Sequence, residues 1–255
     1  MGLLKKLSRF KESSVTTKKD FDFLKNQNNY FSSNIGTNVE KLENFSKYVS
    51  RQSITYFLAR YEIFKKILNV QGSIIECGVL FGGGLISFAQ FSAIFEPINH
   101  QRKIIGFDTF SGFPNISKKD SSKVSDFSHR GGYGIDSYND LKKCIKLYDS
   151  NRFLNHIPKV DLVKGDATKT IPQYLKKNPQ TIISLLYLDF DLYEPTKVAL
   201  ENFVPRMPKG GVIVFDELND AAFPGETLAV LDTLGIRNLK IQRNFHTYMS
   251  YVVLE

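Results

Sequence analysis

Acidic side chains follow two neighbouring apolar runs in the C-terminal half of the chain. Asp189 and Asp191 come directly after one run, and Asp216 and Glu217 after the next. If both runs are parallel strands, their carboxyl ends share one edge of a sheet and the four acids meet there. Carboxylates this close repel one another unless they are protonated or bridged by a cation, and an oxygen-only set suits Mg²⁺ or another hard divalent cation. We favour a metal site over the alternative, in which Asp191 and Asp216 cap helices.

A glycine-rich turn follows an earlier apolar run that ends in Glu76 and Cys77. The turn holds Gly78 and the three consecutive glycines at 82–84, and it opens a helical pattern. Glycines at such a junction let a ligand approach the backbone closely. A plain strand-to-helix turn needs one glycine, so we favour a binding loop, although the spacing is not the G-x-G-x-x-G dinucleotide pattern.

Two further acids stand at strand ends of the same predicted sheet. Asp108 closes the second run, where a ribose diol would lie if the glycine turn held the rest of a nucleoside. Asp166 follows the third run, where an acid can meet a base. The alternatives are a solvated acid at Asp108 and a helix N-cap at Asp166.

The elements that must position these residues alternate between strand and helix after residue 72. Short β-branched runs separated by helical stretches are typical of a parallel sheet covered on both faces, so we predict a doubly wound α/β fold. Two closing runs at 239–243 and 248–254 are separated by too few residues for a parallel crossover, so they must pair antiparallel. The predicted strands are 74–77, 103–107, 161–164, 182–188 and 212–215, and the predicted helices are 85–94, 138–148, 171–175, 196–204 and 226–234.

Composition and charge exclude several classes of protein. The 255 residues are 42% hydrophobic and 24% charged, which is typical of a globular chain. No apolar run approaches the roughly 18 residues of a membrane span. Two cysteines and no signal peptide favour the cytoplasm. The net charge of +8 lies almost entirely in residues 1–70, with 13 basic residues against 6 acidic ones, so we expect no nucleic-acid partner.

The N-terminal extension has three parts. Residues 1–11 form a basic amphipathic pattern, for which we favour a frayed terminus or a cap on the core over weak contact with an anionic membrane. Residues 12–40 are polar, and we expect a flexible or lid-like segment. Apolar positions from 39 to 68 follow a helical period and predict two helices. We therefore divide the chain into an extension at 1–70 and one α/β domain at 71–255.

Other catalytic signatures are absent, and the histidines say little. There is no C-x-x-C pair, H-E-x-x-H, G-x-S-x-G elbow or Walker A loop. His129 lies in a long polar stretch at 111–137 that is long enough to be a substrate lid. We expect His129, like the remaining three histidines, to be a surface or structural residue rather than a substrate contact.

At the residues above, the sequence resembles the TylF/MycF family of S-adenosylmethionine-dependent O-methyltransferases. The resemblance implies a class I methyltransferase (Rossmann-like) sheet of seven strands with an antiparallel last strand, preceded by the helical extension. The matching stretches, in the family's order, are 75–84 (IECGVLFGGG), 106–114 (GFDTFSGFP), 164–172 (KGDATKTIP), 188–200 (LDFDLYEPTKVAL), 205–217 (PRMPKGGVIVFDE) and 223–225.

The resemblance also implies roles for single residues. The methionine end of the methyl donor would lie against Glu76, Gly78, Gly82 and Gly83, its ribose against Asp108 and its adenine near Asp166. The metal ligands would be Asp189, Asp216 and Glu217, and the catalytic carboxylates Asp189 and Asp191. The family more often has Asp where Glu217 stands, which leaves direct ligation by the longer side chain open.

The function implied is magnesium-dependent O-methylation of a sugar or glycosylated small molecule. A divalent cation and a nearby carboxylate would make the acceptor hydroxyl nucleophilic. Three alternatives remain: a methyltransferase of phenols, a non-catalytic binding or scaffold protein that keeps the fold, and an NAD-dependent oxidoreductase, which the glycine spacing disfavours. The helices of the extension could also form a homo-oligomer interface.

Overall fold

The computed structural model describes residues 17–122, 125 and 127–255. By its contacts the chain forms two compact units, which divide between Thr55 and Tyr56. The expected amphipathic helix at 1–11 lies outside the described residues. In the part of the chain that the structure describes, no helix combines the length and the apolar character of a membrane span.

The first unit is helical where the sequence analysis expected a flexible or lid-like segment. Helix α2 (Lys18–Ser33) occupies most of that stretch, so the expectation at 12–40 was wrong for these residues. A capping box explains the helix start, because the Asp20 carboxylate accepts the backbone N–H of Thr17 at 2.7 Å. Thr37 caps α3 (Asn38–Glu43) in the same way. No side chain of α2 is buried within this unit.

The second unit is built on one sheet, as predicted. Among the described residues its seven strands run in the order β3-β2-β1-β4-β5-β7-β6. The first five pair in parallel, and β7 is antiparallel to both of its neighbours. This confirms the class I methyltransferase sheet with an antiparallel last strand. The strands are β1 (Ser73–Cys77), β2 (Ile104–Asp108), β3 (Val160–Lys164), β4 (Ile183–Leu188), β5 (Val212–Phe215), β6 (Gln242–Arg243) and β7 (Ser250–Val253).

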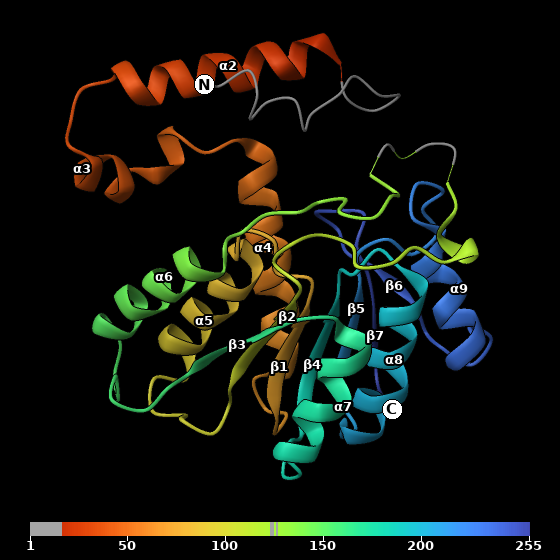
Figure 1. Cartoon of the computed structure of the whole chain (residues 1–255). Helices are drawn as coiled ribbons and strands as arrows, with labels where there is room; N and C mark the ends of the chain where they lie inside the picture. Colours follow the sequence, from red (N-terminus) through yellow and green to blue (C-terminus); the bar gives the residue numbers. More distant parts are fainter. Residues whose placement is uncertain (1–16, 123–124, 126) are drawn as a thin grey trace. The chain divides into compact units, whose positions relative to one another are not determined.

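Helices cover the sheet because successive strand residues point to opposite faces. Ile74 belongs to a core cluster with helix residues Phe64, Phe88 and Leu141, whereas its neighbour Ile75 belongs to the cluster on the other face. Figure 1 shows the helices in these two layers around the strands. The first cluster is completed by α4 (Arg51–Ile67), α5 (Gly83–Phe95) and α6 (Tyr138–Ser150), and the second by α7 (Ala167–Lys177), α8 (Tyr193–Phe203) and α9 (Pro224–Thr233).

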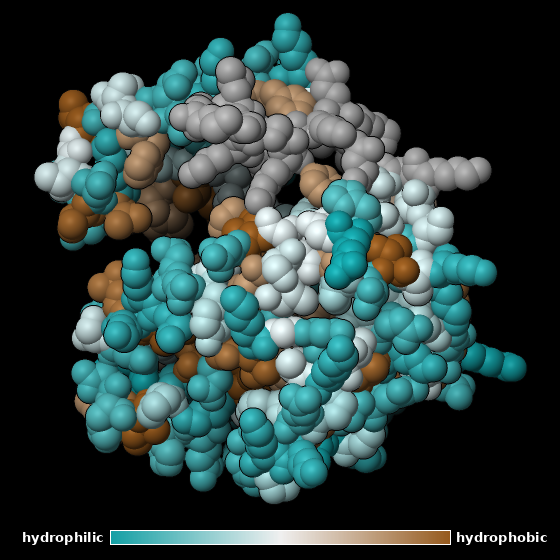
Figure 2. All heavy atoms as spheres, in the orientation of Figure 1, coloured by the Kyte–Doolittle hydropathy of each residue, from teal (hydrophilic) through white to brown (hydrophobic). Residues whose placement is uncertain are grey.

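The helices have a polar outer side. On the face drawn in Figure 2, hydrophilic side chains cover most of the sheet-bearing unit. Helix α6 illustrates the pattern, since Leu141 and Tyr148 are buried while the lysines between them are not. The domain boundary predicted at residue 70 assigns α4 to the N-terminal extension. In the structure, residues Ala59, Ile63, Phe64 and Ile67 of this helix belong to the core of the sheet.

Candidate active site

A cavity of about 580 Å³ opens where the five parallel strands end. Open α/β sheets bind ligands at this edge, because the loops that follow the strands converge there. Each of β1 to β5 contributes the residues that directly follow it. The residues of these loops that line the cavity are Gly78, Val79, Leu80, Asp108, Thr109, Gly165, Asp166, Asp189, Phe190, Asp191, Asp216 and Glu217.

Gly78 is a glycine for a steric reason. Its φ of +95° lies in the left-handed region, and a Cβ atom there would stand 1.9 Å from the carbonyl oxygen of Asp189. The loops after β1 and β4 therefore touch at this point, and they are tied by the Asp189 N–H, which donates to the Cys77 carbonyl at 2.8 Å. The glycine turn positions one of the predicted catalytic acids as well as a ligand surface.

Asp108 holds the glycine turn in place. One carboxylate oxygen accepts the backbone N–H groups of Val79 and Leu80 at 2.8 and 2.9 Å, and the other accepts the N–H of Phe110 at 2.6 Å. Asp108 also lines the cavity. Because a carboxylate has about four acceptor sites, three backbone bonds leave it limited capacity for a ribose hydroxyl.

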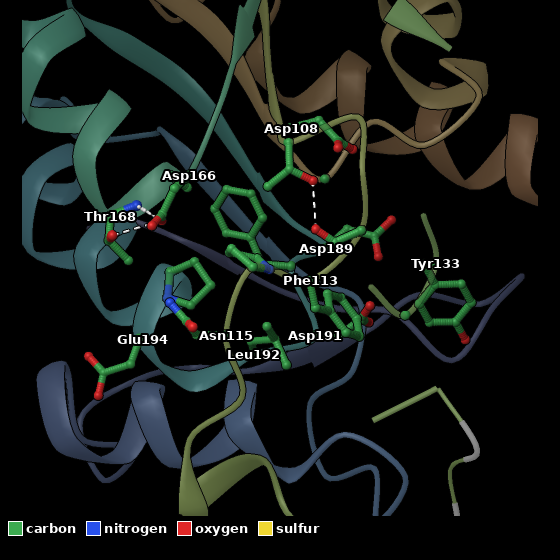
Figure 3. A pocket seen from close by; sticks show the side chains of 18 of the residues that line it. Asp108, Phe113, Asn115, Tyr133, Asp166, Thr168, Asp189, Asp191, Leu192 and Glu194 are labelled. Carbon is green, nitrogen blue, oxygen red and sulfur yellow. Dashed lines mark hydrogen bonds between the residues drawn. The ribbon is translucent and has the colours of Figure 1, made fainter. Parts of the chain in front are cut away.

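Asp166 lines the cavity and caps the N-terminus of helix α7. Its Oδ1 accepts the backbone N–H of Thr168 at 3.0 Å and the hydroxyl of the same residue at 2.7 Å (Figure 3). The N-cap alternative is therefore confirmed, and the side chain still reaches the cavity wall. In the view of Figure 3, Asp166 and Glu194 lie on one side, and Asp189 and Asp191 on the other.

The four predicted rim acids all reach this cavity. Burial raises the pKa of Asp189 and of Asp191, and the charge of Asp216 raises both further. Burial, followed by the charge of Asp191, raises the pKa of Glu217 to about 9. The pKa of Asp216 is also raised by burial, although the Tyr187 hydroxyl donates to its Oδ1 at 2.9 Å. Burial and mutual repulsion thus disfavour the charged forms of these acids, which a bound cation would favour.

The donor atoms of these acids suit a hard divalent cation, but their side chains are not arranged around a common point. They offer oxygen atoms only, which Mg²⁺ prefers, and their mutual repulsion would be relieved by a cation. Within the described ranges, no three acidic, histidine or cysteine side chains are arranged to hold a metal ion.

Three predicted donor-binding residues lie away from the cavity wall. Gly82 and Gly83 form the start of α5, and Gly82 has a φ of +83° with Leu141 packed where a Cβ would be. Glu76 is only 3% exposed and stands behind the turn. Its burial, partly offset by the charge of Arg60, raises its pKa to about 8. None of the three appears among the lining residues.

Sequence reasoning missed several residues at the site. Asp120 and Tyr133 line the cavity from the long loop after β2. Glu226, at the start of α9, is fully buried and accepts the backbone N–H of Glu217 at 2.9 Å. The one signal for Glu226 was its place directly after the matched stretch 223–225. His129 is exposed and does not line the cavity, as expected.

Comparisons with known proteins agree with this geometry. Residues 61–241 match the family described as macrocin-O-methyltransferase (TylF). A relative from Streptomyces olivaceus, 8-demethyl-8-(2,3-dimethoxy-alpha-L-rhamnosyl)-tetracenomycin-C 4'-O-methyltransferase, is 25% identical over 162 residues. That alignment covers 58% of this chain and 54% of the relative, so the chain matches about half the relative's length.

Solved structures extend the similarity to nearly the whole chain. The crystal structure of CalS11, calicheamicin methyltransferase, has a TM-score of 0.89 and 31% identity, covering 97% of this chain and 96% of that one. An apo structure of CalS11, described as TDP-rhamnose 3'-O-methyltransferase, has a TM-score of 0.81 and 30% identity over 97% and 98%. The O-methyltransferase NovP, at 17% identity, a TM-score of 0.61 and coverage of 79% and 80%, shares the fold. With the family match over more than half of its length, this chain belongs to the macrocin-O-methyltransferase (TylF) family of O-methyltransferases.

Proposed function

We propose that this protein transfers the methyl group of S-adenosylmethionine to a hydroxyl of a sugar, either free, nucleotide-linked or part of a glycosylated small molecule. The observation that carries the proposal is the cavity itself, which is lined by the glycine turn after β1 and by acids at the ends of the other four parallel strands, β2 to β5. The family and the two sugar methyltransferases to which the chain is similar support the choice of acceptor.

The donor would occupy the part of the cavity between β1, β2 and β3. Gly78 allows the close approach, and the Asp108 carboxylate that organises the turn would use its remaining acceptor capacity on the ribose. Asp166 would lie near the base. A cationic sulfonium is favoured in a cavity whose wall carries this many carboxylates.

The acceptor would lie against the rim acids. One S–CH₃ bond breaks as an O–CH₃ bond forms, so the cavity must hold oxygen, methyl carbon and sulfur in line. The hydroxyl proton passes to a carboxylate, for which Asp191 is our choice, with Asp189 orienting the hydroxyl. The raised pKa of Asp191, caused by burial and by the charge of Asp216, suits a proton acceptor at neutral pH.

The proposal includes a dependence of the transfer on bound Mg²⁺. Asp189, Asp216 and Glu217 would hold the ion, which when bound would lower the pKa of the acceptor hydroxyl. The cation would also remove the repulsion that raises the pKa of the rim acids. Glu226 would keep the Glu217 backbone in place through its hydrogen bond to that N–H group.

A transfer assay with methyl-labelled S-adenosylmethionine tests each part of this proposal. We expect label to enter glycosides and sugar nucleotides when Mg²⁺ is present, to be lost in excess EDTA and to return when Mg²⁺ is added back. Full activity in EDTA would remove the metal from the mechanism, and transfer to phenols alone would replace the acceptor class. A protein that binds no S-adenosylhomocysteine would be a scaffold.

A further inference from the structure

Tyr133 lines the cavity from the turn at 130–133, where the long loop after β2 closes on itself. Two backbone hydrogen bonds between Phe113 and residues 131–132, at 3.0 and 2.9 Å, close the loop. In Figure 3, Tyr133 lies on the same side of the cavity as Asp191. The acceptor is proposed to lie on this side, so Tyr133 belongs to the acceptor part of the cavity.

The backbone of Tyr133 has a conformation that tyrosine rarely adopts. Its φ of +53° lies in the left-handed region, which is unfavourable for a residue with a Cβ atom. The glycines on either side have no room for a side chain. A Cβ on Gly132 would stand 2.0 Å from the carbonyl oxygen of Phe127, and one on Gly134 would stand 2.9 Å from that of Ser111. The turn therefore brings one large side chain to the cavity in spite of backbone strain, which indicates a function for that side chain.

Three phenylalanine rings hold the ring of Tyr133. It stacks on Phe127, with ring centres 4.4 Å apart and an interplanar angle of 13°. It meets Phe113 edge-on at 5.8 Å and Phe223 at 5.9 Å with an angle of 41°. Phe223 precedes α9, so two separate loops fix the direction of the ring. A phenylalanine at position 133 could make the same ring contacts, so this packing does not account for the hydroxyl.

The hydroxyl of Tyr133 has no hydrogen-bond partner in the part of the chain that the structure describes. The side chain is half-buried, and a tyrosine hydroxyl in such a place usually finds a partner. Burial, followed by the charges of Asp191 and Glu217, raises the pKa of Tyr133 above its ordinary value of 10. The hydroxyl therefore keeps its proton at neutral pH and is a free donor beside the rim acids.

A ligand that meets both the rim acids and this donor must carry two oxygen atoms close together. A sugar does so, because hydroxyls on neighbouring ring carbons stand side by side, whereas a phenol with one hydroxyl does not. A site with a buried donor discriminates strongly against a ligand that lacks the matching oxygen. The Tyr133 hydroxyl is thus suited to a polyhydroxylated acceptor.

We propose that the Tyr133 hydroxyl donates a hydrogen bond to a second hydroxyl of the acceptor sugar and thereby determines which hydroxyl is methylated. This inference rests on the proposed function for the presence of a sugar acceptor. Tyr133 would position the sugar without taking part in the proton transfer. The competing explanation is that its hydroxyl serves a rim acid such as Asp191 during the reaction.

Deoxy sugars separate the two explanations. Tyr133→Phe keeps the ring and removes only the hydroxyl. The acceptors are the methyl glycosides of rhamnose, glucose and galactose, each with its monodeoxy analogues, and kcat/KM is measured with methyl-labelled S-adenosylmethionine. For the best parent glycoside we expect Tyr133→Phe to lower kcat/KM about fivefold or more, because one hydrogen bond is lost. One deoxy analogue should cost the wild type about the same, and Tyr133→Phe should lose no more than about twofold with that analogue relative to the parent.

The position of the new methyl group is a second measurement. NMR of the product should show one methylated position with the wild type and a mixture of positions with Tyr133→Phe. Tyr138→Phe is the matched control, because Tyr138 is a half-buried tyrosine that packs against Phe110 and does not line the cavity. It should change neither kcat/KM nor the product. Both variants should bind S-adenosylhomocysteine within about twofold of the wild type.

Three results would overturn the proposal. Equal falls in kcat/KM for the parent glycoside and all its deoxy analogues would show that the hydroxyl serves a rim acid. Unchanged kcat/KM and product in Tyr133→Phe would show that the ring alone matters. A matching loss of S-adenosylhomocysteine affinity would make Tyr133 a support of the loop. A wild-type chain that methylates none of the glycosides would contradict the proposed function itself, on which the inference rests.

Discussion

The carboxylates at this site fall into two groups: some hold the backbone of the loops in place, and others are candidates for catalysis and metal binding. The carboxylates of Asp108, Asp166 and Glu226 each accept a hydrogen bond from a backbone N–H group, so they hold loops around the cavity in place. Asp189, Asp191 and Glu217 influence one another's charge and have raised pKa values. Burying such acids destabilises the folded state, and this arrangement is typical of functional sites. Substitutions in the two groups should therefore have different effects.

Asp216→Asn should abolish methyl transfer while leaving donor binding intact. The change keeps the size of the side chain and the contact with Tyr187 but removes one of the charges proposed to hold the cation. We expect the magnesium-dependent rate to fall by roughly 100-fold or more, with S-adenosylhomocysteine affinity within a few-fold of the wild type. Glu201→Gln, which changes an exposed acid on α8, is the control. Parallel loss of binding and rate would mean that Asp216 is structural.

The pH dependence of stability should report on Glu76. Above the ordinary glutamate pKa of 4.5 this group is ionised in the unfolded chain, whereas the folded chain keeps the proton until about pH 8. Stability from this group is therefore fully present in acid and is lost as the pH rises from 4.5 to about 8. Urea unfolding of the donor-free protein should show the wild type losing on the order of 3–4 kcal/mol more than Glu76→Gln between about pH 5 and pH 8. Identical losses in both proteins would refute the assignment.

At the scale of elements, the long loop after β2 is fastened to the second layer of helices. Asp120 is 3% exposed, and its Oδ1 accepts the N–H of Tyr193 at the start of α8 at 2.6 Å. Its Oδ2 accepts the N–H of Ser117 at 2.8 Å. The start of α9 packs against the same oxygen, since a Cβ on Gly225 would stand 2.1 Å from Oδ1. One carboxylate thus joins a wall of the cavity to the helix that follows Asp191.

Asp120→Ala should loosen this wall and raise the KM for the acceptor. Removing a cap of this kind costs about 1 kcal/mol of stability, and the loop would lose its fixed position beside the rim acids. We expect the acceptor KM to increase several-fold and the S-adenosylhomocysteine affinity to stay nearly constant. Lys119→Ala, which removes an exposed ion pair with Asp232 and a cation–π contact with Tyr193 but leaves the Asp120 carboxylate in place, should have little effect on either. An unchanged acceptor KM would show that the loop needs no anchor at Asp120.

The start of helix α2 was not predicted from the sequence, although its local chemistry favours a helix there. The capping box of Thr17 and Asp20 starts α2 in a polar stretch whose composition resembles a flexible segment. Composition was misleading there, because capping contributes to helix formation without apolar residues. In contrast, the closing hairpin was predicted from the short connection between its two strands, and β6 and β7 do pair antiparallel.

At the scale of the molecule, Arg102 ties together the end of the sheet opposite the cavity. Its guanidinium donates to the carbonyls of Gly72, Ile67 and Val70 at 2.9, 3.1 and 3.0 Å, and it pairs with Glu96 at 2.7 Å. The three carbonyls belong to the stretch 67–72 between α4 and β1, and Glu96 directly follows α5, so two separate segments depend on one buried side chain.

Arg102→Met should destabilise the protein without impairing its chemistry. Removing one partner of a buried pair leaves carbonyls and a carboxylate unsatisfied, which costs about 3 kcal/mol or more. Chemical unfolding should show this loss, while kcat under stabilising conditions should stay near the wild-type value because the cavity lies at the other end of the strands. Arg206→Met, which removes carbonyl contacts at the surface, should cost far less. A large fall in kcat with normal stability would contradict this separation.

Much of the sheet and of the cavity edge could be inferred from the sequence alone. Apolar periodicity and the residues after each run predict the strands, and parallel strands must bring their following residues to one edge. Asp108, Asp166 and the four rim acids therefore meet as expected. The tertiary structure alone decided that Glu76, Gly82 and Gly83 stand behind the cavity wall. It also decided that Asp120 lines the cavity and that Glu226 holds the backbone of Glu217. Side-chain direction and contacts between distant segments depend on how whole helices pack, and no local pattern encodes that packing.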